Sequence, residues 1–176
     1  RGLRHAPICF PWCGKLKDGY FEQEGVRYEG GQHGFGRDLE HALVEETAES
    51  LTFRLAWSED TLAWYPWKFA LETRHQLAGK ALHTTYTVKN LDEKAMPFQV
   101  GFHFGFAFPF TEGAPTGSCQ LRFQQPEEFR EITTSGGFVT GERPRFTGQQ
   151  VIELNDHLFD DDSICFTGLK SDWAQL

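Results

Sequence analysis

His103 is the residue of this chain best suited to proton transfer. It lies in the stretch Pro97–Phe110, where Gly101, Gly105 and Ala107 share its side of an alternating pattern. An imidazole gains and loses a proton near neutral pH, and glycine inside a strand lacks packing atoms, which suggests a bulge or a close approach by a ligand. Two interpretations stay open: a chemical role for His103, or an ordinary polar position on the outer face of a strand.

A second histidine lies in a glycine-rich segment. Residues 30–38 read Gly-Gly-Gln-His-Gly-Phe-Gly-Arg-Asp, with His33 and Arg37 as candidate binding residues. Glycine at this density indicates backbone dihedrals that other residues avoid, which is common where a loop forms the wall of a site. The segment lacks the strand-then-helix setting of a phosphate loop, so a plain glycine-rich connection is the alternative.

The stretch around His103 predicts a strand with one buried face, because large apolar residues occupy every second position. These residues are Phe98, Val100, Phe102, Phe104, Phe106, Phe108 and Phe110.

Other segments also favour strands joined by turns. Alternation and turn residues predict hairpins within residues 20–28 and between residues 69–77 and 81–90. Leu39–Glu49 fits a helix or a strand; we favour a strand, because residues 51–58 alternate as its hairpin partner would. Residues 111–116 and 133–148 are rich in Gly, Thr and Pro and predict loops.

Composition limits the class of protein. A chain of 176 residues can bury one core, so we expect a single domain over residues 1–176. Its 18 Gly, 8 Pro and 17 Phe favour many short strands and an all-β fold. The net charge of −8 argues against nucleic-acid binding, and no apolar run is long enough to span a membrane.

The four cysteines predict free thiols rather than a disulfide framework. Cys9 and Cys13, with His5 upstream, are not followed by a second pair at zinc-site spacing, so we expect no metal. The acids Asp160–Asp162 are typical of a solvated turn, with one acid facing a ligand as the alternative. The aromatic cluster Trp64–Trp67 fits either the core or a surface that stacks on a sugar ring.

Four segments, in this order along the chain, resemble the aldose 1-epimerase (galactose mutarotase-like) superfamily, especially its LacX-like and hexose-6-phosphate epimerase branches. They are Pro7–Gly19, Gln32–Arg37, Tyr65–Phe69 and Gly101–His103. The resemblance implies a large antiparallel β-sandwich, the galactose mutarotase-like supersandwich. It also implies that the family domain extends beyond both ends of this chain, which would then be a single partial domain.

The resemblance implies a sugar site that needs no cofactor. His103 matches the histidine that protonates the ring oxygen, and His33 matches the histidine that holds the sugar. Lys15 stands where a basic residue contacts hydroxyls, and Asp162 is similar to a sugar-binding acid. We expect Arg37 and Trp67 to complete the contacts. A histidine and a carboxylate suffice for mutarotation, because one group donates a proton while the other accepts one.

The chain also departs from the family pattern. His103 is followed by Phe104 where the family commonly has proline, and Lys15 replaces an arginine that would make a bidentate contact. No glutamate of this chain matches the family's base, so activity of the chain as given is doubtful. Unpaired sheet edges would then favour association of copies into a homo-oligomer.

The hypothesis is a cytoplasmic aldose 1-epimerase-like isomerase that interconverts the α and β anomers of a hexose. One alternative is a hexose-6-phosphate 1-epimerase, in which Arg37 with Lys15 or Arg4 holds the phosphate. The other is a carbohydrate-binding β-sandwich without catalysis. The expected partner is a small-molecule sugar or sugar phosphate.

Overall fold

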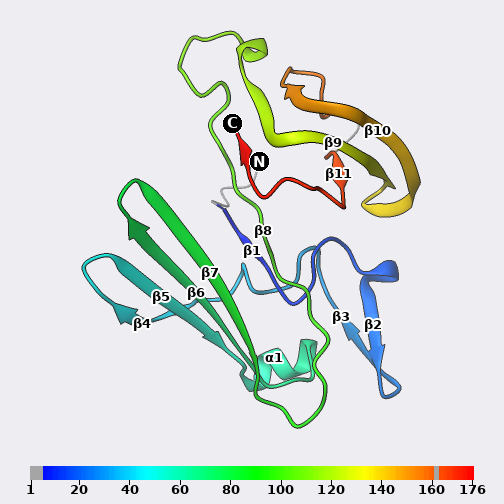
Figure 1. The fold of residues 1–176 in the computed structure, drawn as a ribbon. Coiled ribbons are helices and arrows are strands. Elements are labelled where there is room, and N and C mark those ends of the chain that lie inside the picture. Colours follow the sequence, from blue (N-terminus) through cyan, green and yellow to red (C-terminus); the bar gives the residue numbers. More distant parts are fainter. Residues whose placement is uncertain (1–5, 161–162) are drawn as a thin grey trace. The chain divides into compact units, whose positions relative to one another are not determined.

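The computed structural model describes residues 6–160 and 163–176 (Figure 1). The chain divides into two compact units, one ending at Phe104 and the other comprising Gly105–Leu176. In the described residues, all paired strands are antiparallel, which confirms the predicted all-β class. None of the helices described there is long and apolar enough to cross a bilayer. Arg4 and Asp162 lie outside the described residues.

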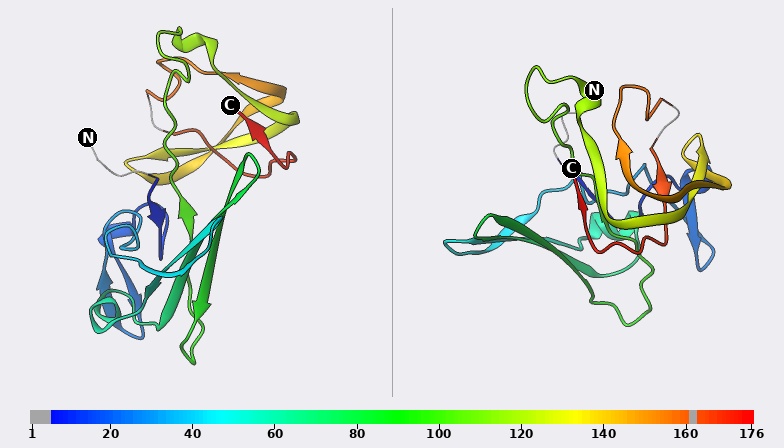
Figure 2. Two further views of the ribbon diagram at one scale, coloured as in Figure 1. Left: turned by 90° about the vertical axis from the view of Figure 1, so that its left-hand side faces the viewer. Right: turned by 45° about the horizontal axis from the view of Figure 1, so that its top comes forward.

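The largest sheet of the first unit has four strands in the order β4-β5-β6-β7. Their bounds are β4 Ala42–Glu46, β5 Ser50–Ala56, β6 Phe69–Ala78 and β7 Ala81–Asn90. The β6–β7 hairpin keeps one register along its whole length and is visible as a long twisted ribbon (Figure 2). The predicted hairpin and the predicted strand within Leu39–Glu49 are both confirmed.

Two small sheets complete the strands of this unit. β1 (Ile8–Cys9) pairs with β8 (Gly101–Phe102), and β2 (Tyr20–Gln23) pairs with β3 (Val26–Glu29) as predicted. The short 3-10 helix η1 comprises Lys17–Gly19.

A short helix that the sequence pattern does not predict, α1, comprises Glu59–Trp64. A capping box starts it: the Ser58 hydroxyl accepts from the Thr61 N–H, and the Thr61 hydroxyl accepts from the Ser58 N–H. These bonds satisfy backbone donors that a helix N-terminus otherwise leaves unpaired.

An aromatic core holds the first unit together. Phe10 and Phe69 are fully buried, with ring centroids 5.0 Å apart. The other buried members of this cluster are Ile8, Leu55, Tyr65, Trp67 and Leu71.

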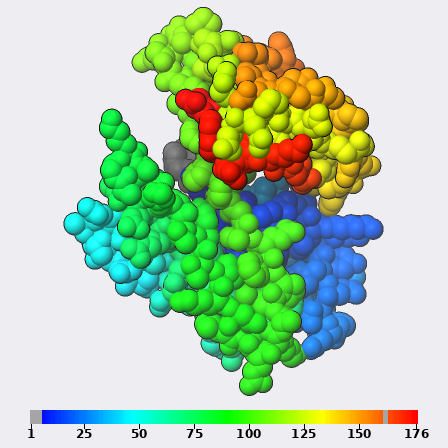
Figure 3. Space-filling view, viewed as in Figure 1, coloured from blue at the N-terminus to red at the C-terminus, as the bar shows by residue number. Residues whose placement is uncertain are grey.

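The prediction of a long strand over Pro97–Phe110 with a buried aromatic face is wrong. Only Gly101–Phe102 forms a strand, and Phe102 and Phe106 are 57% and 65% exposed. The backbone of residues 99–103 runs against residues 7–11, through bonds from Gln99 N–H to Pro11 O and from His103 N–H to Pro7 O. Because this partner is short, the pairing stops at His103. The connection between β7 and β8 lies largely at the surface (Figure 3).

The second unit is built on a long bent hairpin, β9 (Gln120–Ser135) and β10 (Phe138–Glu153), visible in Figures 1 and 2. The strands β11 (Cys165–Phe166) and β12 (Ala174–Gln175) both pair with β9, and η2 comprises Thr116–Ser118. Phe123, Phe129 and Ile152 form its buried core.

The prediction of a loop over residues 133–148 is therefore wrong. Gly141 and Gly148 lie at register shifts, where β-bulges absorb glycine without ending the strand. Pro144 is tolerated because β10 is the outer strand in the order β10-β9-β11.

Candidate functional site

His33 and His103 meet in the first unit. Their ring centroids are 5.9 Å apart, with an interplanar angle of 77°. His33 belongs to the glycine-rich segment, and His103 directly follows β8. Two imidazoles far apart in the sequence are thus neighbours, close enough to contact one small ligand.

Three hydrogen bonds hold His33 in place. Its N–H donates to Gly14 O (2.8 Å), its carbonyl accepts from the Phe10 N–H (3.2 Å), and its ring Nδ1 accepts from the Gly14 N–H (3.0 Å). The backbone of His33 has φ of 68°, in the left-handed region. This conformation is unfavourable for a residue with a side chain, so the surrounding bonds must stabilise it.

Gly34 allows this arrangement because it lies directly against Phe10. A Cβ at Gly34 would stand 2.1 Å from Phe10 O, and the backbone at Gly34 has φ of 68°. A bridge joins Phe10 to Gly34, and the Gly36 N–H donates to Phe10 O at 2.9 Å. The unusual dihedrals predicted for this glycine-rich segment are therefore found at Gly34, where two backbones approach closely.

The contact with Gly14 fixes the protonation of the His33 ring. Nδ1 accepts a hydrogen bond and so carries no proton, which leaves the proton of the neutral ring on Nε2. Burial, and then the positive charges of Arg37 and His103, lower the pKa of His33. The ring therefore stays neutral and presents Nε2–H as a donor.

His103 is held through its backbone. Its N–H donates to Pro7 O, and its side chain is exposed. The segment that leads to it is anchored by Tyr65, whose buried hydroxyl donates to Pro97 O at 2.7 Å. The His103 side chain is therefore accessible to a ligand, while its backbone is held in place.

Gly101, two residues before His103, contacts protein rather than open space. A Cβ there would lie 2.9 Å from the Cys13 Sγ and 3.8 Å from the Cys9 Cβ. The space beside Gly101 is therefore filled by a thiol.

Arg37 braces the segment that contains His33. Its Nη2 donates to Gln32 O at 2.6 Å, and its side chain is 19% exposed. Arg37 also lines a hollow of about 340 Å³, bordered by Trp12 and Trp64. We name this the Arg37 hollow.

Lys15 and Trp67 line a different hollow, of about 530 Å³, which we name the Lys15 hollow. Lys17 and Phe21 also border it. Both hollows fall within the range of about 300–1,000 Å³ typical of small-molecule sites. Trp67 is only 2% exposed and stacks on Phe21, so it belongs to the core and presents little ring surface to a ligand.

The structure thus brings the predicted site residues together only in part. His33, His103 and Arg37 interact, whereas neither hollow is lined by a histidine ring. Among the described residues, no three His, Cys, Asp or Glu side chains form a group that could hold a metal ion.

Sequence reasoning missed two residues that position the site, Gly14 and Tyr65. Gly14 stands inside the first matched segment, but its bond to a histidine ring is a long-range contact. Tyr65 carried a usable signal, because a buried tyrosine hydroxyl requires a hydrogen-bond partner.

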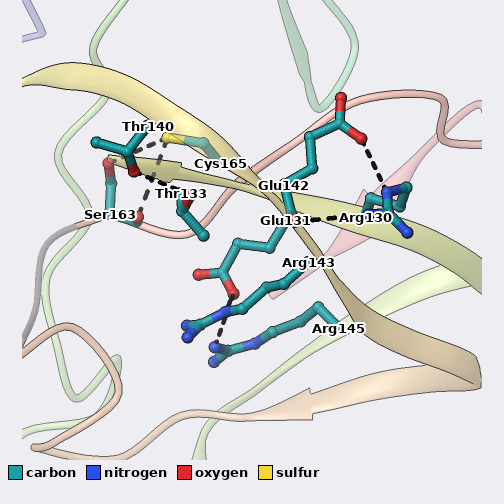
Figure 4. Close-up of polar contacts among 9 residues, drawn as sticks. All are labelled: Arg130, Glu131, Thr133, Thr140, Glu142, Arg143, Arg145, Ser163 and Cys165. Atoms are coloured by element: carbon teal, nitrogen blue, oxygen red, sulfur yellow. Dashed lines mark hydrogen bonds and ion pairs between the residues drawn. The ribbon is translucent and has the colours of Figure 1, made fainter. Parts of the chain in front are cut away.

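The second unit carries a separate polar cluster on β9 and β10 (Figure 4). Arg143 Nε and Arg145 Nη1 both contact Glu131 Oε2, at 2.7 and 3.1 Å. A hydrogen bond to Arg143 lowers the pKa of Glu131 against the opposing effect of burial, and Arg145 adds to the lowering. Arg130 pairs with Glu142 nearby. Glu131, Arg143 and Arg145 line a hollow of about 300 Å³.

Comparison with known proteins identifies the family. The family described as Aldose 1-epimerase matches residues 2–168. The chain belongs to the aldose 1-epimerase family. The plasmid-encoded protein LacX of Lactococcus lactis subsp. lactis is 33% identical, over 94% of this chain and 59% of LacX.

Solved structures agree with this assignment. A galactose mutarotase related enzyme from Lactobacillus acidophilus matches with a TM-score of 0.86 and 30% identity, over 92% of this chain and 54% of that chain. A galactose mutarotase-like protein from Lactobacillus casei ATCC 334 matches with a TM-score of 0.77 and 25% identity, over 89% and 55%. The aldose 1-epimerase-like family and fold predicted from the four segments are confirmed. The chain spans little more than half the length of these relatives.

Proposed function

We propose that this chain forms the acid side of a mutarotase-type sugar site, which interconverts the α and β anomers of a hexose. The observation that carries the proposal is the contact between His33 and His103, with the tautomer of His33 fixed by Gly14. Membership of the aldose 1-epimerase family supports it.

The two histidines take different roles in this proposal. His103 protonates the ring oxygen of the sugar, which opens the ring and lets the anomeric centre rotate before it closes again. His33 donates Nε2–H to a sugar oxygen and keeps the ring oriented. A positioned general acid contributes roughly 10²–10⁴-fold to such a rate.

The reaction also needs a group that accepts the proton of the anomeric hydroxyl. Among residues 6–160 and 163–176, no carboxylate hydrogen-bonds to either histidine ring. The family places its glutamate base in a part of the sequence that no segment of this chain matches. Sugar binding and turnover by this chain are therefore measured separately.

A hexose 6-phosphate is the second candidate substrate. Lys15 and Lys17 border the Lys15 hollow, and Arg37 lines the Arg37 hollow, so cationic side chains stand at both. A phosphate would gain charge-assisted hydrogen bonds from such groups. A carbohydrate-binding module without catalysis is the third candidate.

The test measures anomer exchange directly. Freshly dissolved α-glucose, α-galactose and glucose 6-phosphate are followed by polarimetry or NMR with the unmodified chain and with His103→Asn. The control variant is His83→Asn, at an exposed position on β7. We expect acceleration that His103→Asn removes and His83→Asn retains.

Tryptophan fluorescence separates the candidates. Sugar binding without any acceleration by the unmodified chain would reject the isomerase function for this chain and leave the binding module. Acceleration of glucose 6-phosphate alone would favour the phosphosugar epimerase. No sugar response of either kind would reject all three.

A further inference from the structure

Two cysteine side chains border Gly101, two residues before His103. Cys9 is the last residue of β1, and Cys13 follows four positions later. A Cβ built on Gly101 would lie 2.9 Å from the Cys13 Sγ and 3.8 Å from the Cys9 Cβ, so both cysteines border this one position. Cys9 is 4% exposed, whereas Cys13 is exposed. A disulfide requires Cβ atoms about 4 Å apart, and two cysteines four positions apart that border the same glycine are neighbours from which such a bond can form.

Gly101 leaves room for the side chains of Cys9 and Cys13. It pairs with Cys9 across β1 and β8, and any Cβ on it would stand 2.9 Å from the Cys13 Sγ. The absence of a side chain at Gly101 lets the Cys13 thiol lie over the β1–β8 pair.

The residues that directly follow the two cysteines, Phe10 and Gly14, are also the ones that hold His33. The N–H groups of Phe10 and Gly14 donate to the His33 carbonyl and to its Nδ1. A covalent bond between Cys9 and Cys13 would constrain both donors. It would thereby change the surroundings of the His33 ring.

We propose that Cys9 and Cys13 are a modification site that closes to an intramolecular disulfide when it meets a low-molecular-weight disulfide. The Cys13 thiolate attacks one sulfur of that disulfide, whose S–S bond breaks and releases one thiolate. The Cys9 thiolate then attacks the Cys13 sulfur of the mixed disulfide and releases the second thiolate. Two protein thiols are oxidised, one small disulfide is reduced to two thiols, and the two protons pass to the released thiolates.

The order of attack follows from exposure, because only Cys13 is open to solvent. Burial, and for Cys13 also the neighbouring Cys9, raises the pKa of these thiols. The thiolate fraction at neutral pH is therefore small, and the exchange takes minutes to hours rather than seconds. The disulfide and its effect on the His33 ring are independent of the proposed sugar chemistry.

The test uses the intact chain incubated with oxidised glutathione, followed by alkylation of remaining thiols and digestion with trypsin. One tryptic peptide, residues 5–15, contains both cysteines, whereas Cys119 and Cys165 fall in separate peptides. We expect this peptide to escape alkylation and to lose about 2 Da, reversibly with dithiothreitol. Cys13→Ser should abolish the change, while Cys165→Ser should leave it intact.

A histidine NMR spectrum then tests the link to the site. We expect the His33 ring signals to shift when the disulfide forms and to return on reduction. A peptide that stays a dithiol, or that keeps glutathione on Cys13 without releasing it, would overturn the modification site. An unchanged His33 signal in the oxidised chain would overturn the link, whether or not the chain turns over any sugar.

Discussion

Replacing Gly34 with alanine tests how the structure holds His33. The new Cβ would lie 2.1 Å from Phe10 O and 2.5 Å from Phe10 C, and backbone atoms cannot rotate away as a side chain can. The substitution must therefore separate the Phe10–Gly34 bridge. Two hydrogen bonds are then weakened, from the Phe10 N–H to His33 O and from the Gly36 N–H to Phe10 O.

The size of the effect follows from these losses. Each hydrogen bond contributes about 0.5–1.5 kcal/mol net, and a left-handed backbone costs an alanine about 1–2 kcal/mol. We expect Gly34→Ala to lower the free energy of unfolding by about 2–5 kcal/mol. Gly25→Ala is the matched control, because Gly25 has φ of 78° but no atom within 4 Å of a new Cβ. Its free energy of unfolding should fall only by the cost of placing alanine in a left-handed backbone, about 1–2 kcal/mol.

Urea unfolding followed by tryptophan fluorescence measures both variants. Every tryptophan except Trp173 lies in the first unit, so this signal reports on the unit that contains the site. The His33 ring signals should also move in Gly34→Ala and stay in place in Gly25→Ala. Equal losses of stability in the two variants, with His33 unmoved in both, would refute the view that the backbone contact at Gly34 positions the histidine.

Further predictions concern the groups around His33 and His103. Tyr65→Phe should cost about 0.5–1.5 kcal/mol in urea unfolding, because the bond to Pro97 O is lost; Tyr86→Phe, whose hydroxyl bonds to no described residue, should cost less. The pKa of His33 is lowered in the folded chain, so the folded state favours the neutral ring. The contribution of His33 to the free energy of unfolding should therefore be full above about pH 6.5, the pKa of the unfolded residue, and should shrink as the pH falls from there towards the folded pKa. Arg37→Gln should raise the pKa of His33 in an NMR titration; an unchanged or lower pKa would contradict the electrostatic argument.

Local patterns predicted part of the fold well. The β6–β7 hairpin has alternating residues and a glycine turn at Gly79, so its register depends on neighbours in sequence. The alternation of Pro97–Phe110 was just as regular, yet alternation does not show whether a partner strand lies alongside. Among the residues that the structure describes, only residues 7–11 pair with this stretch, and its aromatic face stays exposed. At Gly141 and Gly148 the sequence could not distinguish a bulge from a loop, since glycine suits both.

The candidate site shows the same limit. The residue types and the glycines around them indicated His33 and His103, because imidazole is the side chain that suits proton transfer near neutrality. Their contact, and the bond from Gly14 to the His33 ring, depend on how distant segments fold together. Trp67 illustrates the opposite case: its type suits a sugar platform, but its burial places it in the core.

The two imidazoles are held in ways that suit different tasks. The His33 N–H donates to the Gly14 carbonyl, the His33 carbonyl accepts from the Phe10 N–H, and the ring Nδ1 accepts from the Gly14 N–H. The ring proton is therefore fixed on Nε2, which remains a hydrogen-bond donor. The ring of His103 makes no hydrogen bond to any residue in 6–160 or 163–176, and only its backbone is anchored. A group that must change its charge during a reaction would be hindered by a bond that favours one protonation state. The contrast between a locked and an unlocked ring is consistent with the proposed roles, orientation of the sugar for His33 and proton transfer for His103.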